Sequence, residues 1–448
     1  MAAKMDRMKQ AETKLLSLAR EFGDRSAYEY NITTLDTPIP RQVIPLRPLG
    51  TDEDEQDLSI HSVRIQSSNA NTHLKNGERA TTTQVPLVLL HGYMNAAAYF
   101  YRNLVGLSHY FDTIHSLDML GWGLSSRPEF DLLTTKATNK ENNDPRQEEL
   151  AQVDAAEQFF VESLEAWRER NGIDKMILAG HSMGGYMSVA YCEKYPERVE
   201  RLILLSPVGV PEESEDTRAR RESMRQASWR FWVISSLAQN IFHYHNPAKV
   251  YRSIPASWGE SMTANYVKNR LPAISDPIEQ EAIAEYLVAN NALPGSGEHC
   301  LKAVLNPFAY AKRPTEYRIP HLKVKSIAFL FGQSDWMDSQ GGLTVQKKCQ
   351  EMRARDEEAP DVSVYQISKA GHLLMLENWK EFNAAVILGA GGSLDCLPNT
   401  SDLSVPTVLQ PKVATELTKD QPQASTGEQQ RRSSTASLSE TSQTSVGP

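Results

Sequence analysis

The chain has 448 residues, of which 40% are hydrophobic and 23% charged, and its net charge is −9. This length can bury a large core, and the acidic balance excludes a general nucleic-acid binder, whose phosphate contacts need a basic face. No apolar run reaches the roughly 18 to 20 residues that span a bilayer, so we expect no transmembrane segment and only peripheral contact with membranes. The cysteines occur singly, which predicts reduced thiols of an intracellular protein and neither a disulfide framework nor a zinc site: Cys192, Cys300, Cys349 and Cys396.

Residues 1–44 are predicted to form an amphipathic and flexible segment ahead of the core. Apolar residues recur at partial helical spacing over residues 1–24, with five basic residues among them. A mitochondrial transit peptide and an ordinary surface helix both fit this pattern, and no secretory signal is expected. The core is expected to begin at residue 45, and residues 58–65 alternate as in an edge strand.

The first buried strand is predicted over residues 85–90, which are continuously apolar as in a strand covered on both faces of a parallel sheet. The strand ends in His91-Gly92-Tyr93. In acyl-transfer sites of this kind, one oxyanion donor comes from this loop and one from the residue after the nucleophile, which here are Tyr93 and Met183. We expect His91 to shape the loop and to transfer no proton.

A second strand is expected over residues 113–118, and the polar stretch 131–150 is expected to be a disordered insertion. Apolar residues at helical spacing follow from Val153 to Trp167, and Asn171-Gly172 ends this helix.

The clearest local motif follows at residues 175–185. An apolar run breaks at Gly180, carries one serine, Ser182, and resumes as a helix after Gly184. This order of strand, sharp turn and helix is the Gly-x-Ser-x-Gly nucleophile elbow, in which a Cβ at either outer glycine would collide with neighbouring backbone. With a further strand at residues 201–205, the alternation of strands and helices predicts an α/β fold with a mostly parallel sheet flanked by helices.

From residue 211 to 318 the alternation stops, and we expect an inserted helical lid that includes an aromatic-rich piece at residues 229–244. The sheet is expected to return over residues 319–390, with a strand at 326–331 followed by Asp335 and Asp338. A carboxylate after a late strand is where a triad acid belongs, and both remain candidates.

The last predicted strand, residues 362–367, leads to Ala370-Gly371-His372, and a histidine on such a loop can reach Ser182. The pattern therefore predicts a triad of Ser182, His372 and Asp335, with Asp338 as the alternative acid. No metal or organic cofactor is needed for this chemistry. Residues 391–448 are rich in Ser, Thr, Gln and Pro and are expected to form a disordered tail.

Taken together, these motifs resemble those of α/β-hydrolases over residues 45–390. More narrowly, the chain resembles the group that contains α/β-hydrolase domain proteins four and five and the fungal mitochondrial cardiolipin-specific deacylase. The more specific points of likeness are segments at the elbow, after the next strand, at the end of the lid and in the acid loop: residues 180–186, 205–209, 311–314 and 335–338.

The resemblance implies a phospholipase-type hydrolase that deacylates glycerophospholipids at a membrane surface, with cardiolipin as a candidate substrate. It also implies a place on the mitochondrial inner membrane, with the cytosol or lipid droplets as the alternative. Family members carry a His-x-x-x-x-Asp motif linked with acyl transfer to lysophosphatidic acid, and here the positions are His372 and Glu377. An acyl-CoA-dependent acyltransferase and a non-catalytic lipid-surface scaffold are the competing hypotheses. The sequence indicates no particular protein partner.

Overall fold

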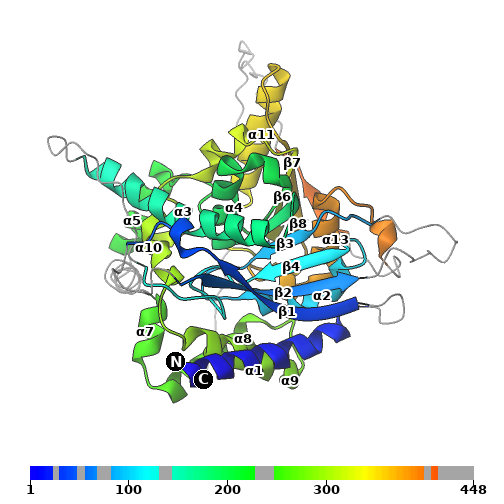
Figure 1. Ribbon diagram of the computed structural model, residues 1–448. Coiled ribbons are helices and arrows are strands. Elements are labelled where there is room, and N and C mark those ends of the chain that lie inside the picture. The colour runs from blue at the N-terminus through cyan, green and yellow to red at the C-terminus, as the bar shows by residue number, and fades with distance from the viewer. Residues whose placement is uncertain are drawn as a thin grey trace, which may run out of the picture. The chain divides into compact units, whose positions relative to one another are not determined.

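The structure, a computed structural model, describes seven stretches of the chain: residues 1–23, 30–47, 56–67, 82–130, 144–227, 247–397 and 405–411. They belong to one unit that ends at Pro411. At its centre is a nine-stranded sheet in the order β1-β2-β4-β3-β5-β6-β7-β8-β9 (Figure 1). The strands are β1 (Tyr30–Ile39), β2 (Leu58–Ser67), β3 (Leu87–Leu90), β4 (Thr113–Leu117), β5 (Met176–His181), β6 (Val199–Leu205), β7 (Ser326–Gly332), β8 (Asp361–Ile367) and β9 (Thr407–Leu409).

The middle of the sheet is parallel. Strands β3 to β8 all pair in parallel, and the antiparallel pairs β1–β2, β2–β4 and β8–β9 lie toward its two edges. Parallel strands need covered faces and therefore read as continuous apolar runs, as β3 and β5 do. The predicted α/β class, with a mostly parallel sheet flanked by helices, is confirmed.

Alternate side chains of each strand enter two separate hydrophobic layers. On β3, Val88 and Leu90 pack with one set of helices, while Leu87 and Leu89 pack with the other. The first set lies above the sheet in Figure 1: α3 (Pro145–Arg170), α4 (Met183–Lys194) and α11 (Gln340–Ala354). The second set contains α1 (Ala2–Leu18), α2 (Tyr101–Leu107), α12 (Leu374–Glu377) and α13 (Trp379–Gly389).

The described parts of the segment between β6 and β7, for which an inserted helical lid was predicted over residues 211–318, contain helices. Its described helices are α5 (Glu215–Ala227), α7 (Pro247–Ser253), α8 (Ala256–Arg270), α9 (Pro277–Asn291) and α10 (Cys300–Val304). Helices α8 and α9 lie beside α1 on the lower side of the sheet (Figure 1). The aromatic-rich piece at residues 229–244 lies outside the described residues. Within the described stretches, we find no helix with the length and hydropathy that crossing a membrane requires.

The N-terminal boundary of the core differs from the prediction. The expected helix is present as α1, but Met8, Ala11 and Leu15 are buried in the core, and β1 joins the sheet from within the segment expected to be flexible. Strand β2 is not an edge strand, because it lies between β1 and β4. Polar residues alternate along β1, and its apolar positions are covered only once distant segments pack on them.

Two segments that were expected to be disordered contain described secondary structure. Helix α3 begins at Pro145, inside the expected insertion 131–150, because the Asp144 side chain accepts a hydrogen bond from the Arg146 amide and caps it. Residues 131–143 lie outside the described part. Within the expected tail, β9 pairs with β8 through Gln366 and Thr407, whereas residues 412–448 lie outside the described part.

Candidate active site

Ser182 sits on a strained turn between β5 and α4. Its φ is 54° and its ψ is −114°, a conformation that non-glycine residues rarely adopt. A Cβ at Gly180 would lie 2.3 Å from the carbonyl oxygen of Gly184, and one at Gly184 would lie 2.6 Å from the carbonyl oxygen of His91. The expected collision with backbone at both glycines is therefore confirmed, and the turn presents the serine at the carboxyl end of the strand.

His372 lies next to Ser182 although 190 residues separate them. Its Nε2 is 3.2 Å from Ser182 Oγ, and its Nδ1 is 3.1 Å from Asp335 Oδ1. The structure thus brings Ser182, His372 and Asp335 into one hydrogen-bonded chain. The side chain of Asp335 is 1% exposed and that of His372 is 18% exposed, so the carboxylate is shielded from solvent while the imidazole is partly accessible.

Asp335 is held as an anion by several donors. Burial alone would raise its pKa, but hydrogen bonds from His372, from the Ser206 hydroxyl and from the Met337 amide outweigh burial and keep the pKa below its usual value. Asp338 is not part of this chain. Its carboxylate accepts from the Gln340 amide at 2.9 Å, at the start of α11, which is the helix-capping role that such an aspartate often has.

The loop that carries His372 is clamped through its backbone. Glu377 accepts hydrogen bonds from the amides on both sides of the histidine, at 2.8 Å from Gly371 and 3.3 Å from Leu373. His181 Nε2 lies 2.9 Å from the carbonyl oxygen of His372 and donates to it. Burial, aided by the nearby His372, lowers the pKa of His181 to about 3, so this ring is neutral.

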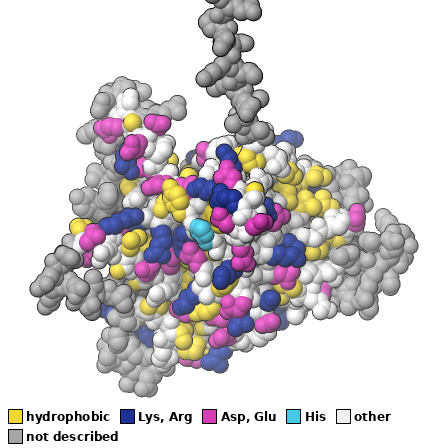
Figure 2. Space-filling model, turned by 90° about the horizontal axis from the view of Figure 1, so that it is seen from above, with side chains coloured by type: hydrophobic (Ala, Val, Ile, Leu, Met, Phe, Trp, Pro, Cys, Tyr) yellow, Lys and Arg dark blue, Asp and Glu magenta, His cyan; other side chains and the backbone are white. Residues whose placement is uncertain are grey.

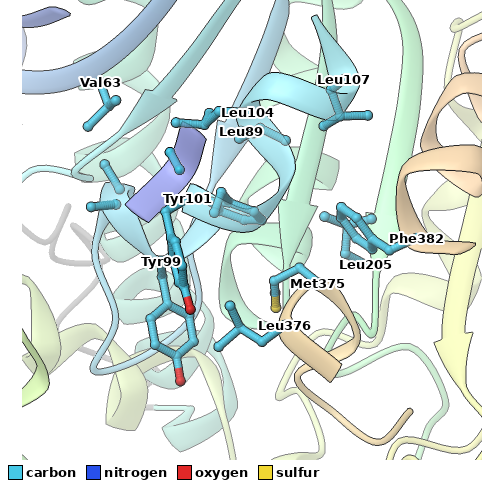
Figure 3. Close-up of a cluster of buried hydrophobic side chains, with 14 of the residues drawn as sticks. Val63, Leu89, Tyr99, Tyr101, Leu104, Leu107, Leu205, Met375, Leu376 and Phe382 are labelled. Atoms are coloured by element: carbon cyan, nitrogen blue, oxygen red, sulfur yellow. The ribbon is translucent and has the colours of Figure 1, made fainter. Parts of the chain in front are cut away.

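Helix α12 anchors the same loop from the other end. Leu374, Met375 and Leu376 begin two residues after His372 and are at most 1% exposed. Figure 3 shows Met375 and Leu376 among aromatic and aliphatic side chains from the strands, α2 and α13. Because this packing fixes α12, it also fixes where Glu377 presents its carboxylate.

A cavity of about 480 Å³ opens in front of Ser182 and His372. Its walls come from the β3 loop, the elbow, the lid helices and the acid loop. They are mostly apolar, and they include Tyr93, Tyr99, Met183, Val208, Tyr251, Met262, Tyr266, Leu287, Leu301, Leu305, Trp336 and Leu373. Trp336 stacks obliquely against His372, with ring centroids 4.9 Å apart. Such a space accepts a long apolar group beside a hydroxyl nucleophile.

The two expected oxyanion donors line this cavity. Tyr93 follows β3, and Met183 is the first residue of α4, where helix amides have no acceptor within the helix. His91 is engaged by backbone on both ring nitrogens: Nδ1 donates to the Gly92 carbonyl oxygen at 2.8 Å, and Nε2 accepts from the Met119 amide at 3.1 Å. Its expected role in shaping the loop is confirmed.

A second cluster of titratable groups joins α1 to β2 and to the residue that follows β4. Glu12, His61 and Asp118 approach one another closely enough to suggest a metal site within the described part of the chain. Each ligand atom already has a partner, however. His61 bonds Glu12 at 3.0 Å and Asp36 at 2.6 Å, while the Asp118 oxygens accept backbone amides at 2.6 Å. The cluster is therefore a buried ion pair that pins α1 to the sheet.

Three residues around the triad were not assigned these roles by sequence reasoning. Ser206 supports Asp335, His181 supports the His372 carbonyl, and Glu377 clamps the loop. A signal existed for Ser206 alone, because it follows a predicted strand that neighbours the elbow strand. The contact of His181 joins positions that are distant in sequence. The contacts of Glu377 depend on the conformation of the loop.

Comparison with known proteins agrees with this fold. The family model for the alpha/beta hydrolase fold matches residues 85–378. A mouse "(Lyso)-N-acylphosphatidylethanolamine lipase" is 34% identical over 305 residues, covering 68% of this chain and 78% of the mouse protein. A rice "Probable 1-acylglycerol-3-phosphate O-acyltransferase" is 30% identical over 305 residues, covering 67% of this chain. "Protein ECM18" of Saccharomyces cerevisiae is 28% identical, covering 70% of this chain and 72% of the yeast protein.

The match spans just under two thirds of the plant relatives, 66% of the rice protein and 65% of an Arabidopsis thaliana 1-acylglycerol-3-phosphate O-acyltransferase. Both acyltransferases and lipases are thus among the relatives, and their names refer to lipids. The expected group is represented among the relatives by a Pongo abelii "1-acylglycerol-3-phosphate O-acyltransferase ABHD5", which is 30% identical over 323 residues, covering 70% of this chain and 82% of the Pongo protein. Since the family model also matches well over half of the chain's length, the chain belongs to the α/β-hydrolase fold family.

Proposed function

We propose that this protein is a serine hydrolase that deacylates glycerophospholipids. The observation that carries the proposal is the continuous hydrogen-bonded chain from Ser182 Oγ through His372 to Asp335, at 3.2 and 3.1 Å, facing an apolar cavity. The fold alone would not suffice, since one fold hosts many activities.

The proposed reaction follows from this geometry. Ser182 attacks the ester carbonyl while His372 Nε2 takes its proton, and Asp335 stabilises the imidazolium that forms. The amides of Tyr93 and Met183 stabilise the oxyanion, each contributing about 10²- to 10³-fold in rate. His372 then protonates the leaving lysolipid, and a water molecule, activated by the same imidazole, releases the fatty acid. No step requires a metal or an organic cofactor.

The lipid substrate is supported by two observations. The cavity walls are mostly apolar, which suits an acyl chain, and the relatives include a lipase of N-acylated phosphatidylethanolamine. Cardiolipin is the head-group candidate that the likeness to the fungal deacylase suggests, together with a site of action at the mitochondrial inner membrane. Lipid analysis of cells with active and inactive protein, combined with fractionation, would test both points.

Acyl-CoA-dependent acylation of lysophosphatidic acid is the second candidate, because the plant relatives carry that name. The candidate motif is His372 and Glu377. Both Glu377 oxygens already accept backbone amides beside His372, which favours a structural role over a part in proton transfer. This contact weighs toward hydrolysis.

The test is the Ser182→Ala variant. It should fold normally and lose nearly all hydrolysis of phospholipid esters, and the parent Ser182 should be labelled covalently by a fluorophosphonate. Full hydrolysis by the variant would overturn the proposal. Net phospholipid synthesis from acyl-CoA and lysolipid that survives in the variant would favour the acyltransferase, and an unlabelled parent would favour a non-catalytic scaffold.

A further inference from the structure

Helix α8 presents large apolar side chains to solvent along one face. Trp258, Met262 and Tyr266, spaced four residues apart, are 67%, 59% and 44% exposed. The neighbouring face, about 100° away at Gly259, Thr263 and Val267, packs against the rest of the protein. Burying three such side chains would be favourable, so a protein that leaves them exposed has a site for a partner that covers them.

The exposed face continues into the candidate active site. Met262 and Tyr266 also line the cavity in front of Ser182, and Trp336, which is 61% exposed, lines it from the acid loop beside His372. The mouth of the cavity is thus bordered by apolar side chains from two elements far apart in sequence. Whatever covers the α8 face also covers the entrance to Ser182.

The α8 face carries no charge between Trp258 and Tyr266. At about 100° per residue, Asn265 and Asn269 lie beside Trp258 and Met262. Arg270 ends this row of side chains one turn after Tyr266, Lys268 points to a flank, and Glu260 points to the far side of the helix. Glu260 pairs with Arg7 of α1 at 2.9 Å. By contrast, the face above the sheet mixes basic and acidic side chains with hydrophobic ones (Figure 2).

We propose that the exposed face of α8, with Trp336, is the surface that docks on a phospholipid bilayer and opens the cavity directly toward it. This inference rests on the proposed function. Trp and Tyr beside an aliphatic side chain suit the boundary between head groups and acyl chains. A bilayer also supplies substrate at the mouth that the same side chains border, whereas a protein partner seated there would close it.

Because the three apolar side chains make the contact and phosphatidylcholine carries no net charge to attract Arg270, the proposal makes a specific prediction about binding. Docking should occur on neutral phosphatidylcholine vesicles and should change less than about twofold between low salt and about 0.5 M NaCl, because screening acts only on charge attraction.

The experiment measures co-sedimentation of the full chain carrying Ser182→Ala with phosphatidylcholine vesicles. Trp258→Ser should lower the partition coefficient about tenfold, since one large apolar side chain no longer enters the bilayer. Asn265→Asp, which adds a charge to the same face without changing side-chain size, should lower it at least as much. Two matched controls should bind within about twofold of the parent: Asn265→Gln, and Val405→Ser, whose valine is 61% exposed elsewhere.

Equal binding by the parent, Trp258→Ser and Asn265→Asp would overturn the inference. Binding that disappears in salt would also overturn it, because attraction would then come from charge. Self-association of the parent without vesicle binding, abolished by Trp258→Ser, would assign the face to a second copy of the chain.

A water-soluble short-chain ester separates this inference from the proposed function. With Ser182 intact, Trp258→Ser should hydrolyse such an ester at the parent rate, because Trp258 does not line the cavity, while losing activity on vesicles. If the parent does not hydrolyse the ester, the proposed function fails and the vesicle result still decides the docking. If it does, and Trp258→Ser binds vesicles normally, only the docking surface is wrong.

Discussion

Glu377 offers a sharp test of how the His372 loop is held. Removing its carboxylate in Glu377→Ala deletes one hydrogen bond of normal length, 2.8 Å to the Gly371 amide, and one long one, 3.3 Å to the Leu373 amide. A hydrogen bond to a charged group is worth about 1.5 to 3 kcal/mol, and the long bond is worth less. The His181 contact and the packing of α12 remain.

We therefore expect a loss of about 2 kcal/mol in the positioning of His372, which corresponds to about a 30-fold fall in kcat. KM should change little, because Glu377 does not line the cavity. Glu377→Gln keeps one acceptor and turns a donor toward the other amide, so its kcat should fall by a smaller factor.

The assay is hydrolysis of a soluble short-chain ester together with the rate at which a fluorophosphonate labels Ser182. Both rates depend on the His372 imidazole and should fall in parallel. Normal hydrolysis and normal labelling in Glu377→Ala would refute the clamp. A loss confined to acyl transfer from acyl-CoA would identify Glu377 as a group used only in that reaction.

Two further perturbations separate the triad from its surroundings. Asp335→Asn should lower kcat about 10³- to 10⁴-fold, because it removes the anion that orients and stabilises His372. The kcat of Asp338→Asn should stay within about threefold of the parent, because an asparagine still accepts the amide hydrogen bond at the start of α11. Equal losses of ester hydrolysis in the two variants would contradict this assignment. Glu12→Ala should destabilise the protein by about 3 to 5 kcal/mol, because it leaves His61 charged and buried. Although burial lowers the pKa of His61, the hydrogen bond and charge of Glu12, with Asp118 and Asp36, raise it to about 10. This stabilisation is therefore complete below about pH 6.5, the pKa of an unfolded histidine, and is lost as the pH rises toward 10. Urea unfolding at several pH values checks this, and a parent stability that does not fall between pH 6.5 and 10 would contradict it.

The elements that sequence reasoning located well are those with strong local signals. The buried parallel strands β3, β5, β6 and β7 contain continuous apolar runs, and β8 alternates apolar and polar residues. The predicted and observed bounds of these five strands differ by at most two residues. Strands β1 and β9 were missed. Both strands contain polar residues and have few buried side chains, so their sequences show no clear strand pattern. They form strands by pairing with β2 and β8, which lie elsewhere in the sequence.

The candidate site divides in the same way. The sequence by itself determined the elbow at Ser182, because the steric demand at Gly180 and Gly184 is local and leaves a recognisable pattern. It also determined that a histidine and an acid follow late strands, because parallel strands bring their carboxyl ends to one edge.

Tertiary structure alone decided which aspartate meets His372, what Glu377 does, and how His181 and Ser206 take part. Asp335 and Asp338 are three residues apart and chemically identical, so only the path of the loop over the sheet edge separates them. Glu377 looks like half of a catalytic motif in sequence, yet its carboxylate turns back to the amides beside His372. Such outcomes depend on hydrogen bonds a few ångströms long between segments that only the folded chain brings together.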